Sequence, residues 1–534
     1  MNEKNEERLF VRKASGLVRI ATSPRVFMFN IFWTAFGFVL TYVFFWGAIT
    51  SPGADLSSGA LLTTVFVLPQ VTLYALFAAI MPRSGGDYHY VGRSLHPSLG
   101  FMVSFAWVVW LSFWAAWGAY AFTSFGLAPI VSTWGAITHN QALVDLGVFL
   151  QSTQAAWAIA AVVLVVSFIL SVVGTETYFK LQNIAFALLL LGLAVFIVLM
   201  LINDNAAFIN GFNNALNWLT GEPNTYNYVI NSAKELGVNL NPEFSWRSLL
   251  ILVPLFYTYM PYCIGSTFMA GEIKDVKKSQ LWGGPFATII LGLWSALLAF
   301  LFIRTIGSQF WYAVGNLWWL GEYNLAVPPY FPSFVGLLTN NVVLYGLMSI
   351  GYLIWGVWFV PQNIMLNSRI MLAWSFDRIA PEKLSYVSER FRTPVINAVL
   401  IFILAQIFLA LYCTFPWLTM VSSIFALAII AIFVGLAGIV FPFRRPEIFE
   451  RSPVAWKIGG IPALSIIALL DVLVGLFVSY FYLTEDTLAA NAPESLWMIF
   501  IIFLVGFIIF WIAKLYRKAQ GIDVELAFKE IPPE

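Results

Sequence analysis

Two long apolar stretches of the chain contain residues that interrupt a helix, and interrupted helices expose backbone groups that can bind a solute. The clearer stretch runs from Leu249 to Ser279, where Pro261 removes a backbone donor and Gly265 follows one turn later. The other runs from Phe29 to Ile49. Freed N–H groups suit a carboxylate, and freed carbonyl groups suit an ammonium or a cation. A simple proline kink without a bound solute explains the Pro261 stretch equally well.

Polar and aromatic residues elsewhere offer further contacts for a solute. Gln362 and Asn363 follow Pro361, and each side-chain amide has both donors and an acceptor. They bind either a solute or only a neighbouring helix. Tryptophans at spacings of three and four form a stripe on one helical face, of which Trp110 and Trp114 are the candidates for a cation–π contact. Such a stripe more often serves packing.

The elements that carry these residues are membrane helices. The chain is 60% hydrophobic and only 10% charged, which excludes an ordinary soluble protein. A membrane helix needs about 20 apolar residues. Twelve stretches meet this requirement: 27–50, 59–81, 99–125, 155–173, 179–202, 248–270, 282–303, 342–366, 395–413, 418–441, 461–483 and 495–513.

The distribution of basic residues predicts the orientation. If the N-terminus is cytoplasmic, the outside segments keep only Lys234, Arg247 and Arg304 of the 28 Lys and Arg. Basic residues near span ends resist translocation, so both termini are expected in the cytoplasm. The long outside segments 203–246 and 307–340 are expected to form extracellular caps. Asp471 is the only carboxylate near the middle of a predicted span, and we interpret it as a protonated or hydrogen-bonded structural residue.

Several functions are disfavoured by what the sequence lacks. The net charge of +1 gives no basic field for nucleic acid, and no GxxxxGK[ST] loop is present to bind nucleotide phosphates. Cys263 and Cys413 lie far apart, and the three histidines fall in predicted loops. We therefore expect no metal site, no cofactor and no enzymatic reaction.

Four segments resemble the amino acid–polyamine–organocation permeases. MPRSGGDYHYVGRSLHPSLGF (Met81 to Phe101) is similar to the family's stretch after span two, and AGEIKDVKKS (Ala270 to Ser279) to the stretch after span six. SRIMLAWSFDRIAP with FRTPVINA, within 368–398, and GLVRIATSPRVFMFN before span one are similar to further family segments.

The resemblance implies an all-α polytopic membrane protein with twelve spans and a five-plus-five inverted repeat. It divides the chain into a cytoplasmic segment (1–26), a first repeat (27–202), an extracellular loop (203–247), a second repeat (248–441), two further spans (461–513) and a cytoplasmic tail (514–534). It also implies that spans one, two, six and seven move as a bundle against spans three, four, eight and nine.

This chain departs from the family pattern at three places. Gly37 stands alone where the family has a glycine cluster, and span six lacks the usual acidic residue. Proton-coupled relatives have a lysine midway along span five, but no lysine occurs between Leu181 and Ile202. Coupling through a lysine is therefore disfavoured, and backbone groups must contribute more to recognition.

The candidate residues follow from these arguments. For substrate binding we predict the unwound part of span one, the break in span six, the aromatic wall and the span-eight amides: Thr34, Ala35, Phe36, Gly37, Met260, Pro261, Tyr262, Gly265, Trp110, Trp114, Gln362 and Asn363. In the loop after span two, Arg83, Asp87 and Arg93 are gating candidates, with Arg93 paired to Asp87 or another inside acid.

The predicted function is secondary active transport of amino acids or related amines across the cytoplasmic membrane by alternating access. The predicted partners are a small-molecule substrate, the lipid bilayer and a coupling ion or counter-substrate whose identity stays open. A receptor that senses an amine without moving it has the same binding site and is the alternative. A channel is disfavoured because the spans lack rings of charged residues.

Overall fold

The computed structural model describes residues 16–415, 418 and 422–529, and these are mostly helical. Ten helical segments among them are long and apolar enough to cross a membrane, or eleven if one bent pair is a single span. They are α3 (Leu56–Ile80), α5 to α6 (Pro97–Ile137), α8 (Thr153–Val172), α9 (Thr175–Ile202), α13 to α14 (Val276–Ile306), α17 to α18 (Val342–Phe376), α19 (Val395–Thr414), α20 (Ser423–Arg444), α22 (Ala463–Thr484) and α23 (Pro493–Ala519).

The bent pair is the first predicted span. It consists of α1 (Ser23–Trp33) and α2 (Phe36–Thr50), which meet at 41°. Thr34 caps the end of α1, and Ala35 has a φ of 49°, a left-handed conformation that ends the regular helix. The break therefore falls within the residues expected from the sequence.

The predicted span 248–270 is not one continuous helix. It begins as α12 (Trp246–Phe256) and continues as three short 3₁₀ turns, η2 (Met260–Tyr262), η3 (Gly265–Phe268) and η4 (Ala270–Glu272). The ring of a proline clashes with the carbonyl four residues earlier, so Pro261 prevents the helix from continuing past Tyr257. Pro254 lies inside α12 and does not end it.

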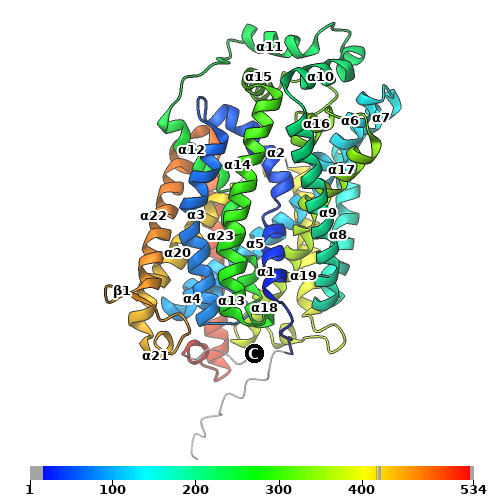
Figure 1. Cartoon of the computed structure of the whole chain (residues 1–534). Coiled ribbons are helices and arrows are strands. Elements are labelled where there is room, and N and C mark those ends of the chain that lie inside the picture. The colour runs from blue at the N-terminus through cyan, green and yellow to red at the C-terminus, as the bar shows by residue number, and fades with distance from the viewer. Residues whose placement is uncertain (1–15, 416–417, 419–421, 530–534) are drawn as a thin grey trace, which may run out of the picture.

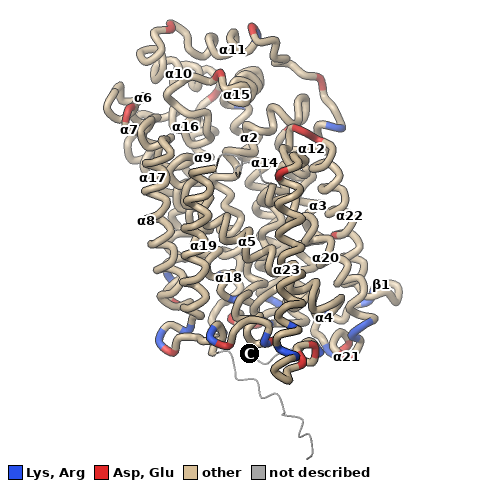
Figure 2. Tube along the Cα trace, turned by 180° about the vertical axis from the view of Figure 1, so that it is seen from behind, with Lys and Arg blue, Asp and Glu red and all other residues tan. Residues whose placement is uncertain are grey.

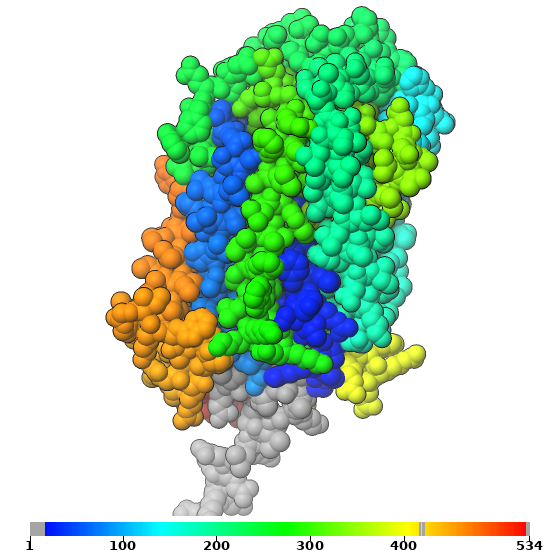
Figure 3. Space-filling model, viewed as in Figure 1, coloured from blue at the N-terminus to red at the C-terminus, as the bar shows by residue number. Residues whose placement is uncertain are grey.

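The helices form one upright bundle, with the described residues nearest both termini at the same end (Figure 1). We call this the terminal end. The segments predicted as caps fold over the opposite end as α10 (Asn205–Thr220), α11 (Thr225–Glu235), α15 (Ser308–Leu320) and α16 (Phe331–Gly336). On one face α14 lies between α3 and α9, and α10 and α11 cover the top (Figure 3).

Charge and exposure agree with a membrane environment. Lys and Arg gather at the terminal end, and the middle of the bundle is almost free of charged residues (Figure 2). Large apolar side chains point outward from α8, α9, α14 and α23, including Val162, Ile184, Phe300 and Trp497. An outward apolar surface of this extent is suited to lipid rather than to water.

The stretch after α3, which the sequence predicts as a loop, contains a helix. Asp87–Ser94 forms a helix, α4, in which every residue is buried. His89 therefore lies in a helix and not in a loop.

Smaller elements complete the chain: the helix α7 (Gln141–Leu150), the two π segments η1 (Phe122–Leu127) and η5 (Trp282–Phe286), the turns η6 (Glu382–Ser385), η8 (Asp486–Leu488) and η9 (Val524–Phe528), the helix α21 (Pro446–Phe449), and the paired strands β1 (Lys457–Ile458) and β2 (Ile461–Pro462).

Candidate functional site

The two helix breaks touch each other in the centre of the bundle. Trp33, the last residue of α1, packs edge-on against Tyr262 of η2 at 5.8 Å and against Phe268 of η3 at 6.0 Å between ring centroids. A Cβ atom on Gly265 would come within 2.6 Å of the Trp33 indole. Glycine at this position therefore allows the indole of the first break to lie directly on the backbone of the second.

Asn30 of α1 joins the two breaks by hydrogen bonds. Its Nδ2 donates to the carbonyl oxygen of Gly283 at 2.7 Å, and its Oδ1 accepts from the backbone N–H of Ser266 at 2.9 Å. The Ser266 hydroxyl in turn lies 2.8 Å from Oε1 of Gln280. Asn30 is completely buried. Asn30 is not among the residues predicted from the sequence, because a single asparagine near the start of a span has no pattern that marks it.

The span-eight amides contact the first break from α18. The Trp33 Nε1 donates to Oδ1 of Asn363 at 2.9 Å, and Nε2 of Gln362 donates to the carbonyl oxygen of Phe29 at 2.9 Å. The other amide atoms, Nδ2 of Asn363 and Oε1 of Gln362, have no hydrogen-bond partner among the described residues although both side chains are fully buried. Buried polar atoms without partners are costly unless something else binds them.

The tryptophan stripe contributes to the centre unevenly. Trp114 packs edge-on against Tyr262 at 5.1 Å, and its Nε1 donates to Ser423 at 2.9 Å. The ring of Trp107 lies 5.9 Å from that of Trp33 and is tilted by 35° to it. Trp110, one of the two expected contributors, instead packs against Phe113 of its own helix, and its Nε1 has no partner among the described residues. Trp107 is thus nearer to the breaks than Trp110.

The remaining candidates near the breaks have structural contacts of their own. The ring of Phe36 lies 4.4 Å from that of Trp355, and a Cβ on Gly37 would come within 3.2 Å of the backbone of α17. Gly37 thus permits close helix packing. The Thr34 hydroxyl donates to its own helix, and the sulfur of Met260 accepts from Thr64.

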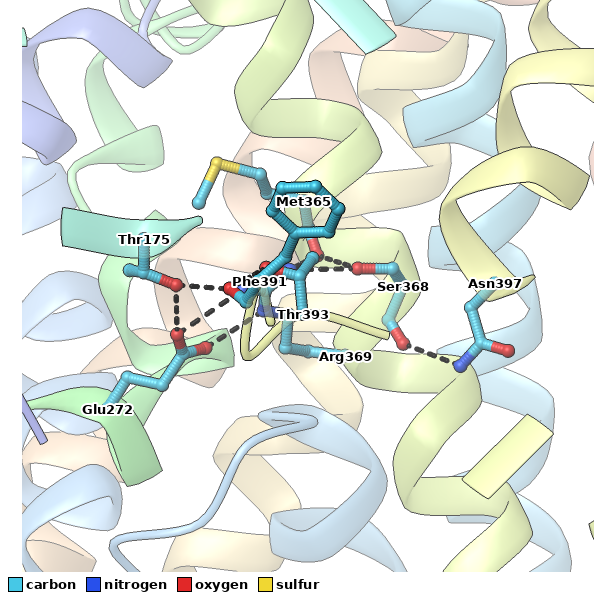
Figure 4. Close-up of polar contacts among 8 residues, drawn as sticks. All are labelled: Thr175, Glu272, Met365, Ser368, Arg369, Phe391, Thr393 and Asn397. Carbon is cyan, nitrogen blue, oxygen red and sulfur yellow. Dashed lines mark hydrogen bonds and ion pairs between the residues drawn. The ribbon is translucent and has the colours of Figure 1, made fainter. Parts of the chain in front are cut away.

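A buried ion pair joins α18 to the last residue of η4, beyond the second break in the chain (Figure 4). Nε of Arg369, on α18, donates to Glu272 at 2.8 Å, and Nη2 donates to the second carboxylate oxygen at 3.2 Å. Thr175, the first residue of α9, donates to Glu272 at 2.8 Å. Exposure of the two charged side chains is 0% and 1%. Such bidentate pairs are strong and directional.

This ion pair also joins the N-terminal segment to the network. The carbonyl oxygen of Glu272 accepts from the backbone N–H groups of Ile20 and Ala21 at 2.9 and 3.0 Å. Nη1 of Arg369 donates to the hydroxyl of Ser368 at 3.0 Å, and Asn397 of α19 donates to the Ser368 carbonyl (Figure 4). Five segments distant in sequence are therefore held together around one buried charge pair.

One of the expected gating residues, Arg93, belongs to a second buried ion pair. Arg93 of α4 bonds to Asp377, which follows α18, at 3.0 Å, and the exposure of these side chains is 1% and 0%. Asp87 instead accepts from the Tyr74 hydroxyl and the Trp107 indole. Arg93 thus pairs with Asp377, another acid at this end of the bundle, and not with Asp87. Arg83 donates to the adjacent Pro82 carbonyl.

A segment near the C-terminus covers α4. Phe528 of η9 packs edge-on against Tyr88 at 5.5 Å, and its carbonyl accepts from Arg445 at 3.2 Å. Arg444 donates to the carbonyl oxygens of Ser94 and Leu95 at the end of α4. These contacts hold the helix that bears Arg93 in place.

Comparison with known proteins supplies the family. The family model described as amino acid permease matches residues 26–508, which is nearly the whole chain. No curated protein matches the sequence. The matched range includes both helix breaks, the span-eight amides and both buried ion pairs.

Proposed function

The chain belongs to the amino acid permease family, and we propose that it is a secondary active transporter of amino acids or related amines that works by alternating access. The observation that carries this proposal is the contact between the two broken helices, α1–α2 and α12–η4, beside polar atoms that have no hydrogen-bond partner among the described residues. An unbroken bundle has no such backbone groups for a solute.

The chemistry at the breaks matches an α-amino acid. The N-terminus of α2 presents N–H groups with partial positive charge, which suit a carboxylate, and the C-terminal carbonyls of α12 suit an ammonium. Asn363 and Tyr262 add one donor and one hydroxyl that have no partners among the described residues. Trp33 and Trp114 supply an apolar wall and aromatic faces for an ammonium.

The Arg369–Glu272 pair acts as a gate. Glu272 follows the broken sixth span, and Arg369 belongs to the eighth, so the pair joins the two groups of helices that move against each other in this type of fold. While the pair is formed, the terminal side of the centre is closed. Opening this side requires the two charges to separate, and water then hydrates them.

We assign the terminal end to the cytoplasm of the cell, because Lys and Arg gather there (Figure 2). The helices α10, α11, α15 and α16 then cover the extracellular end. The segments 27–202 and 248–441 are the two repeats, each beginning with a broken helix, and α22 and α23 follow them.

The test of this function is uptake of radiolabelled amino acids and polyamines into proteoliposomes. Tyr262→Phe removes only a hydroxyl that has no partner among the described residues, so the fold is retained. If that hydroxyl binds a charged group of the substrate, its loss costs about 1.5–3 kcal/mol, and KM rises roughly 10- to 100-fold. The matched control is Tyr228→Phe, on the exposed face of α11, which leaves KM unchanged.

Two results contradict the proposal. Uptake by the Tyr262→Phe protein with the KM of the unaltered protein places the substrate elsewhere. Binding of an amino acid without uptake under any gradient identifies a sensor rather than a transporter.

A further inference from the structure

Asp87, the first residue of α4, is a fully buried carboxyl group without a cationic partner among the described residues. Its Oδ2 accepts two hydrogen bonds, from the hydroxyl of Tyr74 at 2.8 Å and from Nε1 of Trp107 at 2.6 Å. Its Oδ1 has no hydrogen-bond partner in the part of the chain that the structure describes. The carboxyl group thus has one oxygen held by donors and one oxygen free to take a proton.

The basic side chains Arg93 and His89, which lie close to Asp87 in the sequence, bond to other groups. Arg93, on the same helix, bonds to Nδ1 of His89 at 2.8 Å and to Asp377 at 3.0 Å. Nε2 of His89 lies 2.9 Å from the carbonyl oxygen of Ser84. The carboxyl of Asp87 is therefore not part of the Arg93–Asp377 ion pair, although Asp87 and Arg93 both lie on α4.

A second buried carboxyl, Asp471 of α22, lies within electrostatic range of Asp87. It has no exposed surface, and neither of its oxygens has a hydrogen-bond partner among the described residues. A charged carboxylate buried in this way, without hydrogen-bond partners among the described residues, costs several kcal/mol. The other titratable neighbours of the two carboxyls are Tyr74 of α3 and Tyr257 beyond α12, whose hydroxyl donates to Gln70 at 2.6 Å.

Asp87 is connected to the helix breaks through Trp107. The indole that donates to Asp87 lies 5.9 Å from the ring of Trp33 and 5.2 Å from that of Phe268. Trp33 in turn donates to Asn363. Protonation of Asp87 weakens it as an acceptor for Trp107. The group that accepts from Trp107 is thus separated from both breaks by a single indole ring.

We propose that Asp87 binds the proton whose movement drives transport, taking it on Oδ1 from water on one side of the membrane and releasing it to the other. The proposal rests on the transport function proposed above and names its coupling ion. Burial raises the pKa of Asp87 to about 7, although the hydrogen bonds from Trp107 and Tyr74 act in the opposite direction and lower it. The carboxyl thus changes charge near neutral pH. No covalent bond is formed or broken other than the O–H bond of the acid.

The test measures proton movement directly. Purified full-length protein is reconstituted in vesicles that contain a pH-sensitive dye, and an equimolar mixture of the twenty proteinogenic L-amino acids is added outside. Labelled amino acid uptake is followed in the same preparation. We expect the mixture to produce a proton flux into the vesicles and uptake that rises as the outside pH falls through about 7.

The Asp87→Asn protein is expected to lose the amino-acid-dependent proton flux, and Asp87→Glu is expected to restore part of it. The matched control, Asp145→Asn, alters an exposed carboxyl of α7 and keeps the flux. Proton flux through Asp87→Asn at the rate of the unaltered protein overturns the proposal. Uptake without any proton flux in the unaltered protein also overturns it and leaves transport intact. Absence of uptake contradicts the transport function itself.

A second variant keeps the test valid if Asp87→Asn does not fold. Tyr74→Phe removes one of the two donors to Oδ2, and loss of a hydrogen bond to the charged form raises the pKa of Asp87. The midpoint of the pH dependence of uptake is expected to move upward by at least several tenths of a pH unit. An unchanged midpoint in a folded, active Tyr74→Phe protein overturns the assignment to Asp87.

Discussion

Substitution of Glu272 by Gln tests the gate. The Glu272 side chain is 1% exposed and accepts two hydrogen bonds from Arg369. The substitution therefore leaves a buried guanidinium without its counter-charge. Removing one partner of a buried ion pair costs roughly 3–5 kcal/mol. Because glutamine still offers one acceptor, we take the lower end, about 3 kcal/mol.

This cost applies only to the closed state, since both groups are hydrated once the gate is open. A difference of about 3 kcal/mol changes the ratio of open to closed protein by a factor of roughly 100. The substitution should therefore open the terminal side of the centre in a large fraction of molecules, while the helices themselves stay intact.

Labelling by a thiol reagent that cannot cross the membrane measures this opening. Met365, one turn from Arg369 on the side of the helix breaks, is replaced by Cys in a protein that carries Cys263→Ser and Cys413→Ser. Labelling from the terminal side should be faster by up to roughly 100-fold with Glu272→Gln.

The control for the labelling experiment is Glu450→Gln, which breaks an exposed pair with Lys457 and should change nothing. The double variant Glu272→Gln with Arg369→Gln removes the unpaired charge and should return labelling toward the original rate. Unchanged labelling in a folded Glu272→Gln protein refutes the gate.

Three further outcomes are expected. Gly265→Ala places a Cβ within 2.6 Å of the Trp33 indole and should lower stability by about 1–3 kcal/mol and raise KM, as thermal unfolding and uptake would measure. The buried Asp87 has its pKa raised to about 7, so the folded protein keeps a proton that the unfolded chain loses near pH ~4. Stability should therefore fall by up to about 4 kcal/mol as the pH rises from ~4 to ~7 and then level off, and Asp87→Asn should flatten this part of the Tm profile. Phe528→Ala should lower Tm by removing a ring that packs against Tyr88 and should leave amino acid binding unaltered; loss of binding would contradict a role confined to holding α4.

The fold was largely predictable because its signals are local. Apolar stretches of about 20 residues predict spans one by one, and each predicted stretch corresponds to helical segments in the structure, except that residues 419–421 of the stretch 418–441 lie outside the described residues. The stretch 248–270 contained the signal for its own interruption. α12 ends at Phe256, and its C-cap Tyr257 is the residue whose carbonyl would clash with the ring of Pro261 if the helix continued.

The site was predictable only in part, because contacts between distant segments leave no local pattern. Glu272 and Arg369 lie 97 residues apart, and nothing in either segment identifies the other as its partner. Asn30 was missed for the same reason. Trp110 and Trp114 are equivalent in the sequence, but the helix turns only Trp114 toward Tyr262.

Gly37 shows that one residue type serves two purposes. The sequence placed it in the unwound part of span one, since glycine tolerates irregular backbone. In the structure it lies inside α2, where it allows the helix to approach α17 closely. The left-handed residue at the break is instead Ala35, which no propensity rule would select.

The most direct test of alternating access is exchange across the membrane. Proteoliposomes are loaded with an unlabelled amino acid that the protein transports, and uptake of the same labelled amino acid is followed from outside. We predict that loading accelerates uptake and that the label transiently accumulates above its outside concentration. The reason is that each unlabelled molecule that leaves the vesicle returns the binding site to the outside, where it can bind the label. Binding of the label without entry, or entry that loading does not accelerate, would contradict the account.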